Sequence, residues 1–239
     1  MHARETLSIG AVMRELADAC WTDIEPDRVT VAVPIGAFEQ HGPHLPLDTD
    51  TRIATAVAAE LPEVVLAPPL PYGASGEHEG FAGTVSIGAE VTKALIVEYG
   101  RSVCRWAKRV VFVNGHGGNA YPLIEAVSLL RYEGRDAAWL PCAVPGSDAH
   151  AGVTETSLLL HLAPGAVDMT RAAVGATEPI GALMPRLREA GIVSVSANGV
   201  LGDPTEATAE LGARLFASLV ERASAQVARW QPGTEGRLR

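Results

Sequence analysis

The sequence lacks any apolar run that is long enough to cross a membrane. No stretch of about 18 or more apolar residues occurs in its 239 residues. Its opening stretch, MHARETLSIGAVM, also lacks the positively charged flank and long apolar run of a secretory signal. We therefore expect a cytoplasmic protein.

The sequence is also poor in cysteine and in basic residues. Its three cysteines are widely spaced and form no CxxC pair, which is typical of buried thiols in a reducing compartment. The formal net charge of −9 leaves no strong basic field to attract nucleic acid or acidic membrane. The hydrophobic fraction of 47% is ordinary for a folded protein with a sizeable core. We expect one domain over residues 1–239.

Strands and helices are predicted to alternate along the chain. Apolar, β-branched runs predict strands over 29–35, 64–70, 109–113 and 137–144. Helical spacing predicts helices over 7–21, 51–61, 89–108, 121–132 and 153–162. Residues 164–201 are less regular, 203–206 have the composition of a helix start, and the polar tail 231–239 is expected to be frayed. The alternation favours a mostly parallel sheet with helices on both faces.

Polar motifs follow the predicted strands, where ligands collect in parallel sheets. Glu39, His41 and Asp50 lie in a loop stiffened by prolines, directly after the first strand. Carboxylates and imidazoles that converge there suit a divalent cation. For His44, bracing of the loop and contact with substrate both stay open.

The NGHGGN motif follows the strand over 109–113 and contains His116. A glycine-rich phosphate loop is the alternative to a metal role, but Ala120 stands where the third glycine of G-x-G-x-x-G would fall. We therefore favour His116 as a metal ligand.

His150 and Glu155 are five residues apart, so they do not share one helix face. This spacing leaves Glu155 to bind metal and His150 to act as a general acid or base. The alternative is a helix-capping Glu155 beside a surface His150. The long loop over 71–88 offers three side chains that either contact substrate or brace the loop: Ser75, Glu77 and His78.

Together these clusters suit two divalent cations with Asp50 between them. Two such cations against Glu39, Asp50 and Glu155 leave one positive charge, which a bridging hydroxide would cancel. A buried site of zero net charge avoids the cost of isolated charge in a low dielectric.

Four motifs between residues 31 and 161 carry a family resemblance: GAFEQHGPHLPLDTD, GEHEGFAGT, NGHGGN and HAGVTETS. In this order they resemble the creatininase family of metal-dependent amidohydrolases. The segments LPLDTDTRIATAVA, YGASGEHEGFAGTVSIG, LLRYEGRDA and GVLGDPTEATA are similar to the peptidase branch of that family, which acts in mycofactocin biosynthesis.

The resemblance implies a three-layer α/β/α sandwich, a hexameric assembly, and two divalent metal ions per chain, Fe²⁺ or Zn²⁺ with Mn²⁺ as a further candidate. The implied metal ligands are Glu39, His41, Asp50, His116 and Glu155. His150 takes the position of a catalytic or substrate-binding histidine. The peptidase branch hydrolyses a modified, ribosomally made precursor peptide near its C-terminus and releases a Val-Tyr-derived dipeptide unit.

Two positions depart from the creatinine-specific members of the family. Those members carry a metal-binding Glu where this chain has Gly118, and a Trp where it has Gly146. Both differences argue against creatinine as the substrate, and the first makes Glu155 the natural replacement ligand. Hydrolysis of a small cyclic amide or formamide remains an alternative. A non-catalytic metal- or nucleotide-binding protein is a further one.

Overall fold

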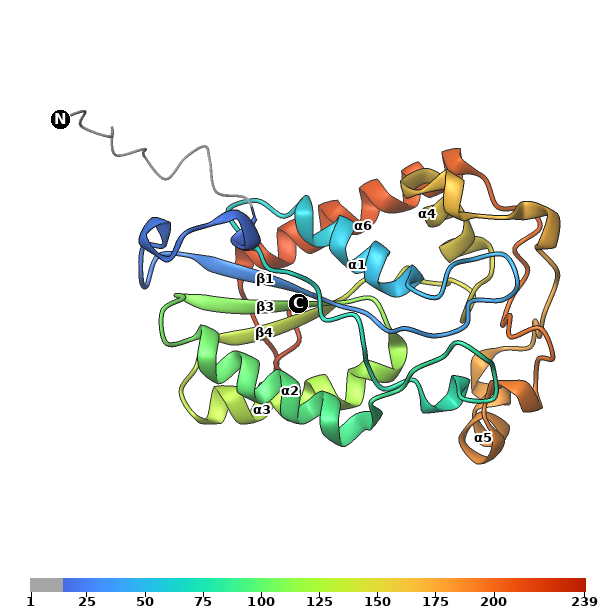
Figure 1. Cartoon of the computed structure of the whole chain (residues 1–239), viewed down its shortest axis with the longest axis horizontal. Helices are drawn as coiled ribbons and strands as arrows, with labels where there is room; N and C mark the ends of the chain where they lie inside the picture. The colour runs from blue at the N-terminus through green and yellow to red at the C-terminus, as the bar shows by residue number, and fades with distance from the viewer. Residues whose placement is uncertain (1–14) are drawn as a thin grey trace.

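A four-stranded parallel sheet in the order β2-β1-β3-β4 forms the centre of the computed structural model, which describes residues 15–239 (Figure 1). The strands are β1 (Thr30–Ile35), β2 (Val65–Leu66), β3 (Arg109–Asn114) and β4 (Ala137–Pro141). Asn114 pairs with Ile35 on one side and with Pro141 on the other. The carboxyl ends of β1, β3 and β4 are therefore level, so the loops that follow them start from one edge.

Helices cover both faces of the sheet, as the resemblance implies. One layer contains α1 (Thr49–Ala59), α4 (Val153–Leu162) and α6 (Ala209–Arg229), and the other contains α2 (Gly88–Val103) and α3 (Ala120–Tyr132) (Figure 1). In β3, Val111 and Val113 belong to the core on one face, and Val110 and Phe112 to the core on the other. Burial on both faces explains why the strands read as nearly continuous apolar runs. The predicted three-layer α/β/α sandwich is confirmed.

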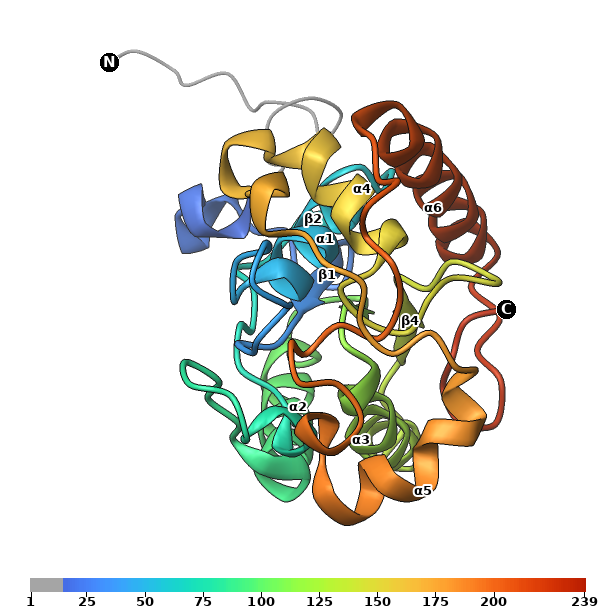
Figure 2. The same ribbon diagram turned by 90° about the vertical axis from the view of Figure 1, so that its right-hand side faces the viewer.

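A sixth helix, α5 (Ile180–Ala190), lies at the end of the molecule toward which the strands point (Figures 1 and 2). The sequence assigned no helix here, because the segment is irregular and Pro185 interrupts the helical composition. Within the described residues, no helix combines the length and apolar character needed to span a membrane.

The two ends of the chain differ from expectation. Residues 7–14 of the helix expected over 7–21 lie outside the described residues, and the rest forms 3-10 turns at Leu16–Asp18 and Trp21–Asp23 instead of an α-helix. The tail over 231–239 is not frayed. Leu238 is 1% exposed and its N–H donates to the carbonyl of Trp139 in β4. The tail thus adds to the edge of the sheet and buries an apolar side chain.

The helix start predicted at 203–206 is also wrong. There the Asp203 carboxylate accepts the N–H of Thr205 at 2.9 Å, which makes a local turn. Helix α6 starts at Ala209, and its N-cap is Thr208, whose hydroxyl accepts the N–H of Leu211 at 3.1 Å.

Candidate metal centre

Five side chains meet at the carboxyl edge of the sheet, and we call them the floor. The floor residues are Glu39, His41, Asp50, His116 and Glu155. The first two follow β1, the third lies in the first turn of α1, the fourth follows β3, and the last lies in the first turn of α4. All except Glu155 are at most 5% exposed. The structure therefore brings together the complete predicted ligand set.

Glycines let α1 come close to the strand ends. A Cβ at Gly36 would lie 2.5 Å from the backbone nitrogen of Thr51, and one at Gly115 would lie 2.3 Å from the carbonyl oxygen of Asp50. Both distances are too short for any side chain. The absence of a Cβ at these positions thus allows the carboxylate of Asp50 to enter the floor.

Asp50 lies between the two histidines of the floor. Its Oδ1 is 3.1 Å from His41 Nε2, and its Oδ2 is 3.3 Å from His116 Nδ1. His116 Nδ1 is also 3.2 Å from Glu39 Oε1, whereas His41 Nε2 is 4.0 Å from Glu155 Oε2. The two carboxylate oxygens of Asp50 thus face two separate donor groups. Asp50 could therefore offer one oxygen to each of two cations, as the sequence predicts.

Several buried carboxylate oxygens of the floor have no hydrogen-bond partner in the described part of the chain. They are both oxygens of Glu39 and Oδ2 of Asp50, although imidazole nitrogens lie 3.2–3.3 Å from Glu39 Oε1 and Asp50 Oδ2 without forming a well-aligned hydrogen bond. A buried charged oxygen without a partner is costly, and a cation removes that cost. Oxygen and imidazole donors together suit divalent ions of the first transition row. The floor therefore fits the implied metals.

The ring orientations of His41 and His116 agree with this fit. His41 Nδ1 is 3.1 Å from the carbonyl oxygen of Glu39, and His116 Nε2 is 2.9 Å from that of Ala74. A carbonyl only accepts hydrogen bonds, so these two nitrogens carry the ring protons. The opposite nitrogens face the carboxylates, as in histidines that bind metal and donate to the backbone.

Charge within the floor is strongly coupled. Burial opposes protonation of His41, but Asp50 outweighs it and raises the pKa of His41 to about 10. Burial also opposes protonation of His116, but Glu39 and Asp50 outweigh it and raise the pKa of His116 well above its usual value. Burial raises the pKa of Glu155 to about 7. The carboxylates thus draw positive charge to the imidazoles, and cation binding would displace those protons.

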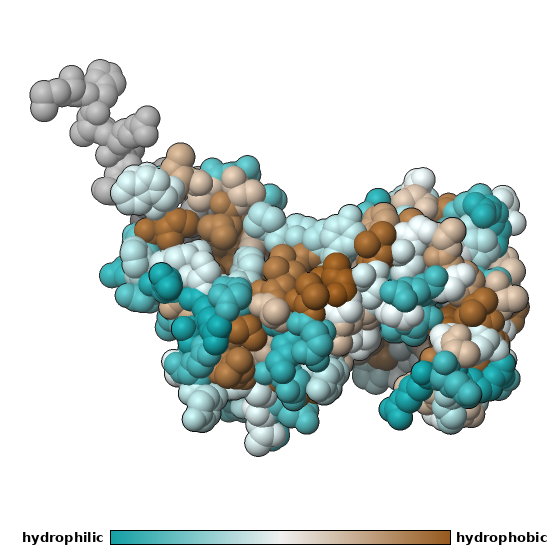
Figure 3. Space-filling view, turned by 60° about the horizontal axis from the view of Figure 1, so that its bottom comes forward, coloured by the Kyte–Doolittle hydropathy of each residue, from teal (hydrophilic) through white to brown (hydrophobic). Residues whose placement is uncertain are grey.

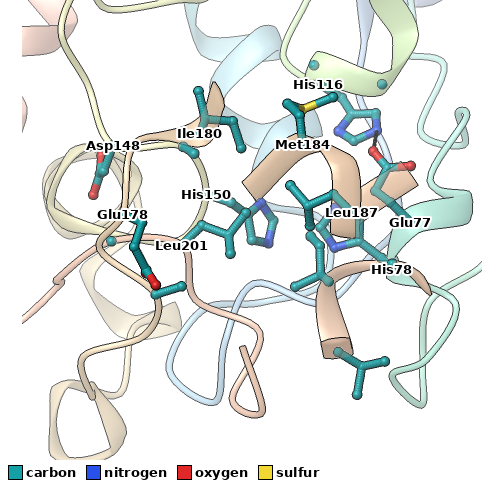
Figure 4. A pocket seen from close by; sticks show the side chains of 18 of the residues that line it. Glu77, His78, His116, Asp148, His150, Glu178, Ile180, Met184, Leu187 and Leu201 are labelled. Carbon is teal, nitrogen blue, oxygen red and sulfur yellow. Dashed lines mark ion pairs between the residues drawn. The ribbon is translucent and has the colours of Figure 1, made fainter. Parts of the chain in front are cut away.

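Two further histidines, His78 and His150, adjoin the floor. The His150 ring lies 4.3 Å from that of His41 and 4.5 Å from that of His78, measured between centroids. Burial lowers the pKa of His78 to about 4 and that of His150 well below its usual value, so both rings are neutral. Figure 4 shows both rings facing the cavity. Both histidines thus border the floor. The sequence had offered His78 only as a residue that contacts substrate or braces its loop.

The other predicted substrate contacts are placed differently. His44 Nε2 is 2.8 Å from the hydroxyl of Thr156 in α4, and Ser75 is fully buried. Neither lines the cavity. Of the two roles left open for these residues, bracing of the loop agrees better with these positions, and His44 braces its loop against α4. Glu77 does line the cavity, with its Oε1 3.8 Å from His116 Nε2.

A cavity of about 1310 Å³ opens beside the floor. Ile180, Met184 and Leu187 of α5 line it together with Leu201, and Figure 4 shows these side chains around His150 and His78. We call these four residues the apolar wall. Ile180, Met184 and Leu187 stand at helical spacing, and this spacing was the available sequence signal for α5.

Sequence reasoning missed Gln40 as well as α5, because nothing in the local sequence of Gln40 distinguishes it from a loop residue.

The chain matches known proteins over most of its length. Residues 17–227 match the family model of creatininase, described as creatinine amidohydrolase. The chain belongs to the creatininase family. Its amidohydrolase and peptidase relatives support a hydrolase function for this chain. It is 57% identical over 217 residues to the mycofactocin precursor peptide peptidase of Mycolicibacterium smegmatis, covering 87% of this chain and 88% of that protein. It is 52% identical over 240 residues to the protein of the same name from Mycobacterium tuberculosis, covering 95% and 96%.

The fold agrees with solved structures of the family. A structure described as manganese creatininase superposes with a TM-score of 0.79 at 26% sequence identity, and the match covers 93% of this chain and 100% of that one. The name of that structure includes manganese, a divalent metal.

Proposed function

We propose that the chain is a metal-dependent peptidase that hydrolyses an amide bond near the C-terminus of the modified mycofactocin precursor peptide and releases a Val-Tyr-derived dipeptide unit. The observation that carries the proposal is the floor of unpaired carboxylate oxygens at one side of a cavity of about 1310 Å³. The names of the relatives supply the substrate class.

The floor residues would hold two divalent cations, Fe²⁺, Zn²⁺ or Mn²⁺, with Asp50 between them. Bound there, the cations would polarise the amide carbonyl and lower the pKa of water. His150 faces the same space with Nδ1, 3.9 Å from Glu39 Oε1. In this proposal His150 accepts a proton from the attacking water and returns it to the leaving amine.

The cavity favours a peptide over creatinine. Its volume exceeds what a small cyclic amide fills, and the apolar wall offers contact area to a bulky side chain. A Cβ at Gly118 would lie 2.2 Å from the carbonyl oxygen of Ala74, so this backbone excludes the Glu that we expect in creatinine-specific members. Space around Gly146 is open. Hydrolysis of a formamide or another small amide is the second candidate, since the floor would serve it equally.

The test is to incubate the purified chain, loaded with metal, with the modified precursor peptide and to follow release of the dipeptide unit by mass spectrometry. We expect release that chelator abolishes and added metal restores. Creatinine and a formamide form a parallel panel. Absence of any fragment from the metal-loaded chain, together with turnover of a small amide, would transfer the assignment to the second candidate.

We also propose that the chain forms a homo-oligomer, a hexamer by family resemblance. Large apolar side chains are exposed around the start of α2 and α3: Tyr72, Val85, Val91, Leu95 and Tyr121. Figure 3 shows apolar surface gathered on the face that carries these helices. Exposed apolar patches mark association sites. Light scattering with Val91→Asp beside the wild type tests this, since a monomeric wild type would contradict it.

A further inference from the structure

Gln40 lies between two floor residues, and its amide has one defined orientation. Its Oε1 accepts the backbone N–H of Gly42 at 2.8 Å, and its Nε2 donates to the carbonyl oxygen of Gly199 at 3.0 Å. A backbone N–H only donates and a carbonyl only accepts, so these two contacts identify the oxygen and the nitrogen of the amide. Gln40 is 5% exposed.

The second amide proton of Gln40 determines the protonation of His78. Gln40 Nε2 is 3.0 Å from His78 Nδ1. Since the amide nitrogen only donates, Nδ1 accepts, and the ring proton of His78 lies on Nε2. That nitrogen is 3.2 Å from Glu39 Oε1. His78 therefore turns an N–H toward the floor and not a lone pair.

The main chain of Gln40 determines the protonation of His150. His150 Nε2 is 2.8 Å from the carbonyl oxygen of Gln40, so Nε2 carries the proton. The 3.1 Å approach of Gln40 Nε2 to the same ring nitrogen is not a second donation, because both amide protons are already used at Gly199 and His78. Nδ1 of His150 is left bare on the side of Glu39.

The surrounding loop is shaped to the amide. A Cβ at Gly199 would lie 1.9 Å from Gln40 Oε1, and Gly199 has φ +80°, which glycine adopts without strain. The same stretch of chain pairs Leu201 with His150 through backbone hydrogen bonds of 2.9 and 3.2 Å. Gln40, Gly199 and His150 are thus held as one unit.

Four imidazoles surround the carboxylates, and one differs from the rest. His41, His116 and His150 each donate one ring proton to a main-chain carbonyl and point the other nitrogen at the floor. We propose that Gln40 is a positioning residue that holds His78 with its proton toward Glu39. His78 is thereby kept out of the ligand set and acts as an N–H donor in the site, while His150 keeps a bare nitrogen for proton transfer. The role of His150 in catalysis rests on the proposed function, whereas the tautomers do not.

The test reads the tautomers directly, by long-range ¹H–¹⁵N correlation of the histidine rings in the zinc-loaded, diamagnetic chain. In the wild type we expect the proton of His78 on Nε2 and that of His150 on Nε2. In Gln40→Glu a carboxylate replaces the amide and only accepts, so His78 shifts its proton to Nδ1. His150 keeps its tautomer, because its acceptor is the main-chain carbonyl of residue 40.

Gln226→Glu is the matched control, since Gln226 also donates its side-chain amide to a backbone carbonyl, that of Leu238, far from the floor. It should leave both rings unchanged. A wild-type His78 with its proton on Nδ1, or with Nε2 bound to zinc, overturns the proposal even if Gln40→Glu does not fold. An unchanged His78 in a folded Gln40→Glu variant also overturns it. None of these readings needs substrate, so they are independent of the proposed reaction.

An activity measurement adds the functional consequence. With the modified precursor peptide, Gln40→Glu should lower kcat by about 10–100-fold with little change in KM, which is the range for residues that orient metal-site groups. The zinc content per chain should match that of Gln226→Glu. A loss confined to KM would contradict a positioning role.

Discussion

The floor and the apolar wall border one cavity, but they are built in different ways. Floor side chains come from strand ends and from the first turns of α1 and α4, and all but Glu155 are deeply buried. Main-chain contacts hold some of them, such as the one between His116 and the carbonyl of Ala74. The wall comes largely from one helix outside the three layers, and Ile180 is 44% exposed (Figures 2 and 4). From this difference we expect the floor to set the chemistry and the wall to set the substrate preference.

This division has a physical basis. A buried carboxylate that lacks a partner tolerates little displacement, so the floor must be held by the rigid sheet. Apolar contact is non-directional, so a peripheral helix can supply it and can vary without disturbing the metal ligands. Changes in the floor should therefore remove activity on every substrate. Changes in the wall should alter the preference among substrates.

The largest effect is expected from the floor. Glu39→Gln removes the charge of a fully buried ligand. We expect kcat/KM to fall by at least about 10³-fold, equivalent to about 4 kcal/mol. Glu60→Gln, at an exposed glutamate after α1, is the control. Near-normal kinetics for Glu39→Gln would contradict a role of the floor in catalysis.

Removal of metal tests whether the floor also depends on cations for stability. Chelation leaves Glu39 and Asp50 buried without their counter-charge. At a free cation level about 100 times Kd, binding contributes about 3 kcal/mol. Calorimetry of the chelated chain should therefore show Tm lower by roughly 6–12 °C. Equal Tm values with and without chelator would contradict a metal-filled floor.

A substitution in the wall should separate the two regions. Ile180→Ser removes apolar contact area from the cavity but leaves the ligands in place. We expect kcat/KM on the modified precursor peptide to fall about tenfold, with unchanged metal content and unchanged turnover of any small amide. Val174→Ser, which is 52% exposed and outside the cavity, provides the comparison. A similar loss in both variants, or loss of metal in Ile180→Ser, would break the proposed division.

The smallest effect is expected away from both regions. Thr208→Ala removes the N-cap of α6 and should cost about 1 kcal/mol of unfolding free energy. That corresponds to a Tm decrease of roughly 2–4 °C with unchanged kcat/KM. Thr234→Ala, at an exposed threonine of the tail, should change neither. A drop in activity for Thr208→Ala would show that α6 influences the floor through α4.

The floor could be predicted from the sequence because its residues occupy short motifs next to strong strand patterns. Glu39, His41 and His116 lie within a few residues of a strand end, and the parallel sheet brings such ends to one edge. Their position followed from local pattern and topology alone. The layers of the sandwich were predictable for the same reason.

The wall, Gln40 and the tail could not be predicted, because their roles depend on contacts between distant residues. Gln40 touches Gly199, which is 159 positions away, and nothing local indicates that contact. The polar tail folds back on Trp139. Asp203 has the composition of a helix start, yet its carboxylate makes a turn with Thr205. In each case tertiary contacts outweigh local propensity.

The central claim is that the five floor side chains bind a pair of divalent cations. Elemental analysis of wild type and Glu39→Gln, each purified without added metal, measures this directly. The wild type should carry about two divalent ions per chain, as a shared carboxylate implies, and the variant clearly fewer. A metal-free wild type that still cleaves the peptide, or equal metal content in both proteins, would contradict the claim.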